Sequence, residues 1–360
     1  MKKTLVFVLV LGLLGAMAFA QSAPALQWTG YLNSGAVLGS YTLGSVTTTN
    51  MAFYGSDAGK PYRVNIMGKY AADNWGLYFR FRNQSVPDAD YFPRIYGWVT
   101  AANGMVKLMA GRLGTYDYST NGWQSFGNQD TAYGVQAELM PVKGLTIGVF
   151  APLVDSANNT KNSVDWVMNS LQSGFMYSMD NVGYISAGLD AGNHFFWVGL
   201  SYTGMAALTA VIEAKDLMTA TEAANYFYTD QHFAYNMAPL NIGLWAEEQF
   251  NAKPATGAPS TMWRVMPSVD YTMDVYNFGA FVNVLGDGTN TGFGPGAWAK
   301  VNVAKGVSTT LSLQYDSTIT TVQNAPTING SANLSGPWSI ANFTKTDGYL
   351  LVDLDFIWSF

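Results

Sequence analysis

The chain has 360 residues with 18 basic and 24 acidic side chains, a formal net charge of −6, and no cysteine. This acidic balance argues against a nucleic-acid-binding protein, and the lack of cysteine excludes disulfides and thiol chemistry. Charged residues make up only 12% of the sequence, against about 25% in soluble domains. So few charges favour a protein that faces lipid as well as water.

The N-terminus has the features of a secretory signal peptide. Two lysines precede a short apolar run, and Ala-Phe-Ala stands directly before Gln21. The run is too short to span a bilayer, so residues 1–20 are expected to be cleaved and residues 21–360 to form one exported domain. The mature part has no apolar run of about 18 residues for a transmembrane helix.

Apolar and polar residues alternate along most of the mature chain, which predicts β-strands. In segment 75–82, Tyr78, Arg80 and Arg82 fall on one face and apolar residues on the other. Segment 276–284 has the same period of two. Short connectors rich in turn-forming residues join such segments into hairpins. They lie at Asp73-Asn74, Asn103-Gly104, Lys143-Gly144, Asp180-Asn181, Thr203-Gly204, Ala238-Pro239, Asp274 and Lys305-Gly306.

This organisation predicts an all-β fold, a transmembrane antiparallel up-and-down barrel with short turns at one end and longer loops at the other. The hairpins, with a first strand at about 26–39 and a last strand at 348–360, lead to an expected count of about 18 strands. A count of about 16 is the alternative if the hairpin at Asp180-Asn181 does not form. Helical turns are expected after Ser163 and after Thr219.

The last strand carries the most specific pattern. Its apolar face comprises Leu350, Val352, Leu354, Phe356, Trp358 and Phe360, and Asp353 and Asp355 fall on the other face. The segment resembles the closing strand of bacterial outer-membrane β-barrels, whose terminal Phe is read by the assembly machinery. The resemblance implies a location in the outer membrane, contact with its lipid, and recognition of Phe360 by the barrel-assembly machinery.

Strand phase assigns many charged residues to the lumen, because a cation facing lipid at the midplane costs about 2–4 kcal/mol. The expected basic residues, which form one arc of wall, are Arg63, Lys69, Arg80, Arg82 and Lys107. The expected acidic residues on the remaining wall are Glu138, Glu213, Glu247, Asp270, Asp316, Asp353 and Asp355. Opposed arcs would set up an electric field across the pore. The alternative is a lumen in which both signs are mixed.

The strand Leu108-Met-Ala-Gly-Arg-Leu-Gly-Thr-Tyr116 resembles the strand of general diffusion porins that ends in a Gly-Arg pair before the third long loop. The resemblance implies that the loop at 113–131 folds into the barrel, with Arg112 at the constriction. It places Asp117 and Asp130 on the loop as acidic partners, and it implies a homotrimer. The Pro-Glu-Phe-Gly-Gly-like loop motif of enterobacterial porins is absent.

The expected function is passive diffusion of small hydrophilic solutes through a water-filled pore, with no cofactor, no metal and no enzymatic turnover. His194 and His232 have no ligand or triad spacing, and no hydrolase or phosphate-binding motif occurs. Two alternatives remain open. One is a substrate-specific channel, for instance for sugars, in which Trp245 and Trp298 stack on the solute. The other is a surface adhesin or structural barrel whose long loops bind another cell.

Overall fold

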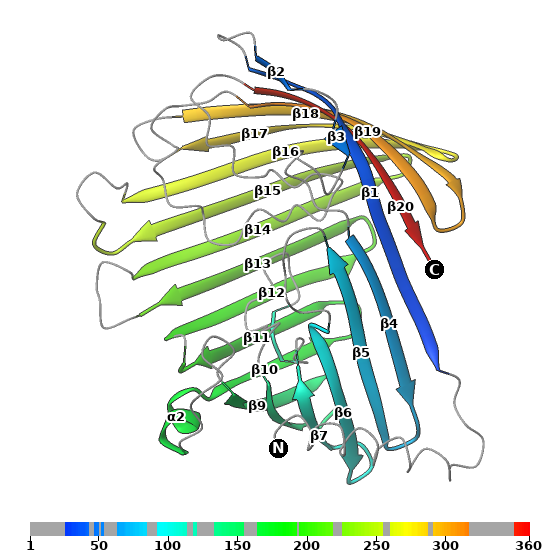
Figure 1. Ribbon diagram of the computed structural model, residues 1–360. Coiled ribbons are helices and arrows are strands. Elements are labelled where there is room, and N and C mark those ends of the chain that lie inside the picture. The colour runs from blue at the N-terminus through cyan, green and yellow to red at the C-terminus, as the bar shows by residue number, and fades with distance from the viewer. Residues whose placement is uncertain are drawn as a thin grey trace.

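A single strand with one apolar and one polar face cannot bury either face by itself. In the computed structural model, the strands pair side by side and close into a barrel (Figure 1). The structure describes residues 26–42, 47–49, 52–53, 63–84, 92–113, 118–120, 133–154, 164–192, 194–218, 225–254, 260–286, 291–316 and 349–360. The expected signal peptide, Asp117 and Asp130 lie outside these residues.

The barrel wall has 18 antiparallel strands, as the hairpin count predicts. In the first half of the chain the strands are β1 (Gln27–Thr42), β4 (Arg63–Ala71), β5 (Trp75–Gln84), β6 (Arg94–Ala101), β7 (Val106–Arg112), β8 (Tyr133–Leu139), β9 (Leu145–Val154), β10 (Gln172–Met179) and β11 (Gly183–Asp190). They continue as β12 (Phe195–Met205), β13 (Leu208–Leu217), β14 (Tyr226–Met237), β15 (Leu240–Asn251), β16 (Thr261–Met273), β17 (Tyr276–Gly286), β18 (Thr291–Ala304), β19 (Val307–Asp316) and β20 (Tyr349–Ser359). Two short strands, β2 (Thr47–Thr49) and β3 (Ala52–Phe53), pair with the second half of β1.

Each wall strand pairs with its neighbours in the chain, and β20 pairs with β1 to close the ring. Beyond the last strand residue, Phe360 exchanges two backbone hydrogen bonds of 3.0 Å with Gly30. The hairpin at Asp180-Asn181 forms between β10 and β11, so the alternative of 16 strands is not adopted.

The short hairpin turns that the structure describes lie together at one end of the barrel (Figure 1). Asn103, Asn181 and Asp274 adopt positive φ angles of 56°, 58° and 51° in these turns, a conformation that Asn and Asp tolerate better than other side chains do. The turn expected at Thr203-Gly204 is displaced. β12 continues to Met205, with a register irregularity after Tyr202, and the turn follows at 206–207.

Within the described residues, helix α2 (Val164–Asn169) follows Ser163 as expected. The helical turn expected after Thr219 lies outside the described residues. Among the residues that the structure describes, no helix is long and apolar enough to cross a membrane.

Polar side chains are buried inside the barrel and apolar side chains are exposed outside. Along β12, Val198 and Leu200 on the outer face are 46% and 47% exposed, whereas Trp197 on the inner face is fully buried. Gln136 and Glu213 on other strands are also fully buried on the inner face. This distribution suits a wall between lipid and an aqueous interior.

Candidate functional site on the inner face of the barrel

A group of basic side chains lies on the inner face of β4, β5 and β6. Arg80 is in register with Arg94, and Lys69 with Tyr78. The buried amide oxygen of Asn65 accepts a hydrogen bond of 2.9 Å from Nε of Arg80 and a longer one of 3.5 Å from Nε of Arg82. One neutral side chain thereby holds two cations on the same wall. Arg94, the first residue of β6, joins this group.

For two residues of the expected lumen set, the structure describes the strand position alone. Arg63 is the first residue of β4, and Asp316 is the last of β19. Their strand positions share the inner phase of Asn65 and Gln314, but their side chains lie outside the described part of the structure.

Lys107 and Glu138 form an ion pair across β7 and β8. The Nζ atom of Lys107 lies 3.3 Å from Oε2 of Glu138, whose side chain is fully buried. The amide of Gln136 also donates to Oε1 of Glu138. Glu138 therefore compensates a member of the basic arc instead of facing it from the other side.

A row of four charged residues crosses β13 to β16. Glu213, Asp230, Glu247 and Arg264 are successive register partners on the four strands. All three carboxylates are at most 1% exposed. The Arg264 guanidinium lies 3.4 Å from Oε2 of Glu247. With one cation for three carboxyl groups, this row is the acidic part of the wall.

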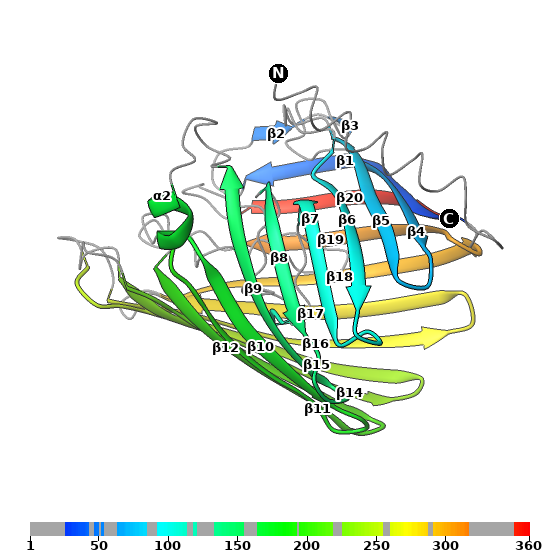
Figure 2. The same ribbon diagram turned by 90° about the horizontal axis from the view of Figure 1, so that it is seen from below.

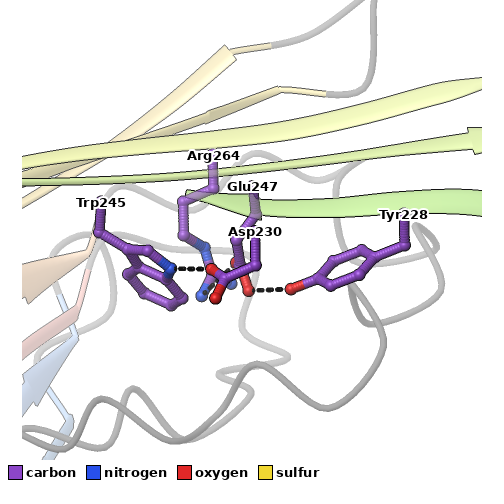
Figure 3. A network of polar contacts seen from close by, with 5 residues as sticks. All are labelled: Tyr228, Asp230, Trp245, Glu247 and Arg264. Carbon is purple, nitrogen blue, oxygen red and sulfur yellow. Dashed lines mark hydrogen bonds and ion pairs between the residues drawn. The ribbon is translucent and has the colours of Figure 1, made fainter. Parts of the chain in front are cut away.

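Aromatic side chains hold this row from both sides, as Figure 3 shows. The Tyr228 hydroxyl donates to Oε1 of Glu247 at 2.5 Å, and the indole N–H of Trp245 donates to Oδ1 of Asp230. Asp230 was missing from the expected set. Its strand carries polar residues on both faces, with Thr229 and Gln231 on the outside, so alternation alone did not reveal its direction.

The basic group and the acidic row lie on opposite walls. β4 is the second and β13 the eleventh strand round the closed ring of 18, so half of the ring separates them. Figure 2 shows β4 to β6 across the barrel from β14 and β15. Register and ring closure together therefore produce the segregation of charge.

The acidic residues of the expected set on β20 do not oppose the basic group. Asp353 and Asp355 are buried on the inner face of β20, next to β1 and close to the basic wall. Asp270 accepts hydrogen bonds of 2.9 Å from the amides of Asn241 and Asn277. Asp270 lies on β16, on the wall of the acidic row, and both of its hydrogen-bond donors are neutral amides.

Arg112 ends β7, in register with Ile95 and Tyr133. Its guanidinium lies 5.5 Å from the centroid of the Tyr133 ring, and Nη1 donates to the carbonyl of Phe92 at 3.1 Å. Tyr133 is 39% exposed on the outer phase of β8. These contacts hold Arg112 at the end of the wall. A role at the constriction stays a prediction.

The connection after β7 enters the barrel at Tyr118–Thr120. These three residues are at most 4% exposed. The Ser186 hydroxyl on the inner face of β11 donates to the Tyr118 carbonyl at 2.9 Å. The aromatic ring of Tyr118 packs with Phe150 and Trp197 in a cluster of buried inner side chains.

Two inner tryptophans lie along the wall, each against a glycine of a neighbouring strand. The Trp197 ring covers Gly188, and the Trp298 ring covers Gly279. A Cβ at either glycine would come within 2.1 Å of the ring, so the rings occupy the place of the missing side chains. The indole N–H of Trp298 donates to Asn277 at 2.8 Å. This arrangement makes Trp298 part of the wall, and a sugar-stacking role of Trp245 and Trp298 stays a prediction.

No protein-family model matches the sequence, and a search among curated proteins gives no match. Solved structures are similar in fold. A multiply substituted variant of the porin of Rh. blastica superposes with a TM-score of 0.50 at 14% sequence identity, covering 93% of this chain and 100% of that one. OmpT, an outer membrane protein of Vibrio cholerae in its trimer form, gives 0.51 at 11% identity, over 94% and 100%. The fold of this chain is that of the porin-type β-barrels.

Proposed function

We propose that this chain is an outer-membrane porin through which small hydrophilic solutes and ions diffuse passively. The inside-out distribution of side chains on a closed barrel of 18 strands carries the proposal. Such a wall separates lipid from an aqueous lumen. The crossing needs no cofactor and no turnover, because the solute moves down its own gradient.

The opposed charges would make the pore selective. The proposed basic residues are Arg63, Lys69, Arg80, Arg82 and Lys107, with Arg94 beside them and Arg112 at the end of the wall. The proposed acidic side is Glu213, Asp230 and Glu247, with Asp117 and Asp130 as further candidates. A field across the lumen orders water and discriminates between solutes by charge and dipole. The width of the lumen would exclude larger solutes in addition.

Planar-bilayer recording tests the proposal directly. The folded mature chain should insert in discrete steps of conductance, and the same preparation unfolded by heat should not. Swelling of vesicles in sugars of increasing size would then give the exclusion limit. Folded, inserted protein that gives no conductance steps would contradict a porin.

The cellular part of the proposal is that residues 1–20 direct export, that Phe360 is read by the barrel-assembly machinery, and that the barrel resides in the outer membrane. A homotrimer is proposed as well, supported by the trimer form of OmpT, which has a similar fold. Electrophoresis of unheated protein and chemical cross-linking test the trimer. A monomer in both experiments would contradict it without affecting the channel.

A further inference from the structure

Tyr118 sits in a socket of glycines on the inner wall. A Cβ at Gly148 would lie 2.0 Å from Cδ1 of the Tyr118 ring, and one at Gly174 would lie 2.9 Å from Cδ2. Gly148 and Gly174 are register partners on β9 and β10. The ring therefore occupies space that any larger residue at these positions would fill. Neither glycine has a positive φ, so the backbone conformation does not require glycine at these two positions.

The contact continues along the segment to the next strands. The Ser186 hydroxyl on β11 holds the Tyr118 carbonyl, and Thr120 packs on Gly199 of β12. Gly199 is the register partner of Glu213, the first member of the acidic row. The described residues Tyr118–Thr120 thus lie across the inner face of β9 to β12, and Thr120 lies beside the acidic wall.

From this geometry we propose that Tyr118 is the positioning residue that holds the segment Tyr118–Thr120 against the inner wall and thereby sets the width of the lumen at this level. The ring supplies the apolar contact, and the glycines supply the space. The statement about lumen width rests on the proposed channel function, whereas the docking itself does not.

A disulfide tests the docking without any measurement of current. The chain has no cysteine, so Thr120→Cys with Gly199→Cys introduces one pair. A Cβ at position 199 would lie 3.0 Å from Cβ of Thr120, slightly below the roughly 3.5–4.5 Å found in disulfides. The methyl group that would clash is removed by the substitution of Thr120. The matched control is Thr120→Cys with Ser312→Cys, which places the second thiol on the inner face of β19.

We expect the pair on β12 to cross-link under mild oxidation and the control pair not to. Adding Tyr118→Ala should reduce the yield strongly, and Tyr118→Phe, which keeps the ring, should restore it. Equal yields for the two pairs, or a yield that Tyr118→Ala leaves unchanged, would overturn the proposal. Retention of the folded electrophoretic form shows that the barrel itself is intact in each variant.

Conductance tests the consequence. Tyr118→Ala and Gly148→Ala should both raise single-channel conductance, because the first removes the ring and the second fills its socket. The matched control is Gly243→Ala on β15, where a new Cβ would meet the Ser268 hydroxyl at 2.5 Å and no part of the docked segment. Unchanged conductance in the first two variants would overturn the statement about lumen width. An absence of current in the parent protein would instead contradict the proposed function, and the cross-linking result would still decide the docking.

Discussion

Arg264 and Glu247 face each other on neighbouring strands, with Nη1 of the arginine 3.4 Å from Oε2 of the glutamate. The carboxylate is fully buried and the guanidinium side chain is 12% exposed. Arg264 is the one cation in the row that also contains Glu213 and Asp230. It therefore has a larger electrostatic role than an ordinary surface ion pair.

Replacement of Arg264 by Met should destabilise the folded barrel by about 3 kcal/mol, because it leaves a buried carboxylate without its cation. Urea unfolding in detergent or lipid vesicles measures the change. The double variant Arg264→Met with Glu247→Gln should recover most of the loss. An equal loss in both variants would show that the charge of Glu247 is not the cause.

Removal of the charges of Arg80 and Arg82 should shift ion selectivity toward cations. The two side chains share Asn65 as a partner on the inner wall, opposite the acidic row. Their loss removes positive potential from one side of the lumen. The reversal potential in a salt gradient measures the shift for Arg80→Ala with Arg82→Ala. Lys143→Ala is a suitable control, since Lys143 is 83% exposed in a turn. An unchanged reversal potential would remove both arginines from the conduction path.

Glu138→Gln should shift selectivity in the opposite direction. Glu138 compensates Lys107 at 3.3 Å, so the amide leaves a cation uncompensated on the basic wall. The same reversal-potential measurement detects the change. The paired variant Glu138→Gln with Lys107→Met should return close to the parent value. A shift toward cations in the single variant would contradict the ion pair.

The direction of side chains on β9 can be tested by placing arginine on either face. Val149 is 43% exposed on the outer face. Val149→Arg should reduce the free energy of unfolding by about 2–4 kcal/mol if the residue lies near the bilayer midplane. Thr146→Arg, on the inner face of the same strand, should have a much smaller effect. Folding into lipid vesicles over a urea series compares the two. Equal losses would contradict the assignment of inside and outside.

Phe360→Ala should reduce the amount of assembled protein in cells more than it reduces folding in detergent. The Phe360 ring covers Gly30, whereas the proposed recognition by the assembly machinery would contribute only in cells. Phe356→Ala is the matched control, an exposed aromatic residue on the same strand. If both variants lower cellular assembly equally, the terminal position has no special role.

The sequence alone determined where most wall strands lie and which face points inward where polar and apolar residues alternate strictly, and it left their number at about 18 or about 16. Alternation with a period of two is a local property, and turn-forming residues such as Asn103 and Asn181 mark the hairpins within a few residues. The displaced turn after Thr203-Gly204 shows the limit of this reading, because a bulge adds residues without changing the local pattern.

Only the tertiary structure decided which charged residues meet. Glu138 pairs with Lys107, and Glu213, Asp230 and Glu247 align with Arg264, because strand register brings together residues far apart in the chain. The docking of Tyr118 on Gly148 likewise depends on the course of a connection that has no period. Local alternation selects the face of a strand, whereas register, ring closure and loop path select the neighbour on that face.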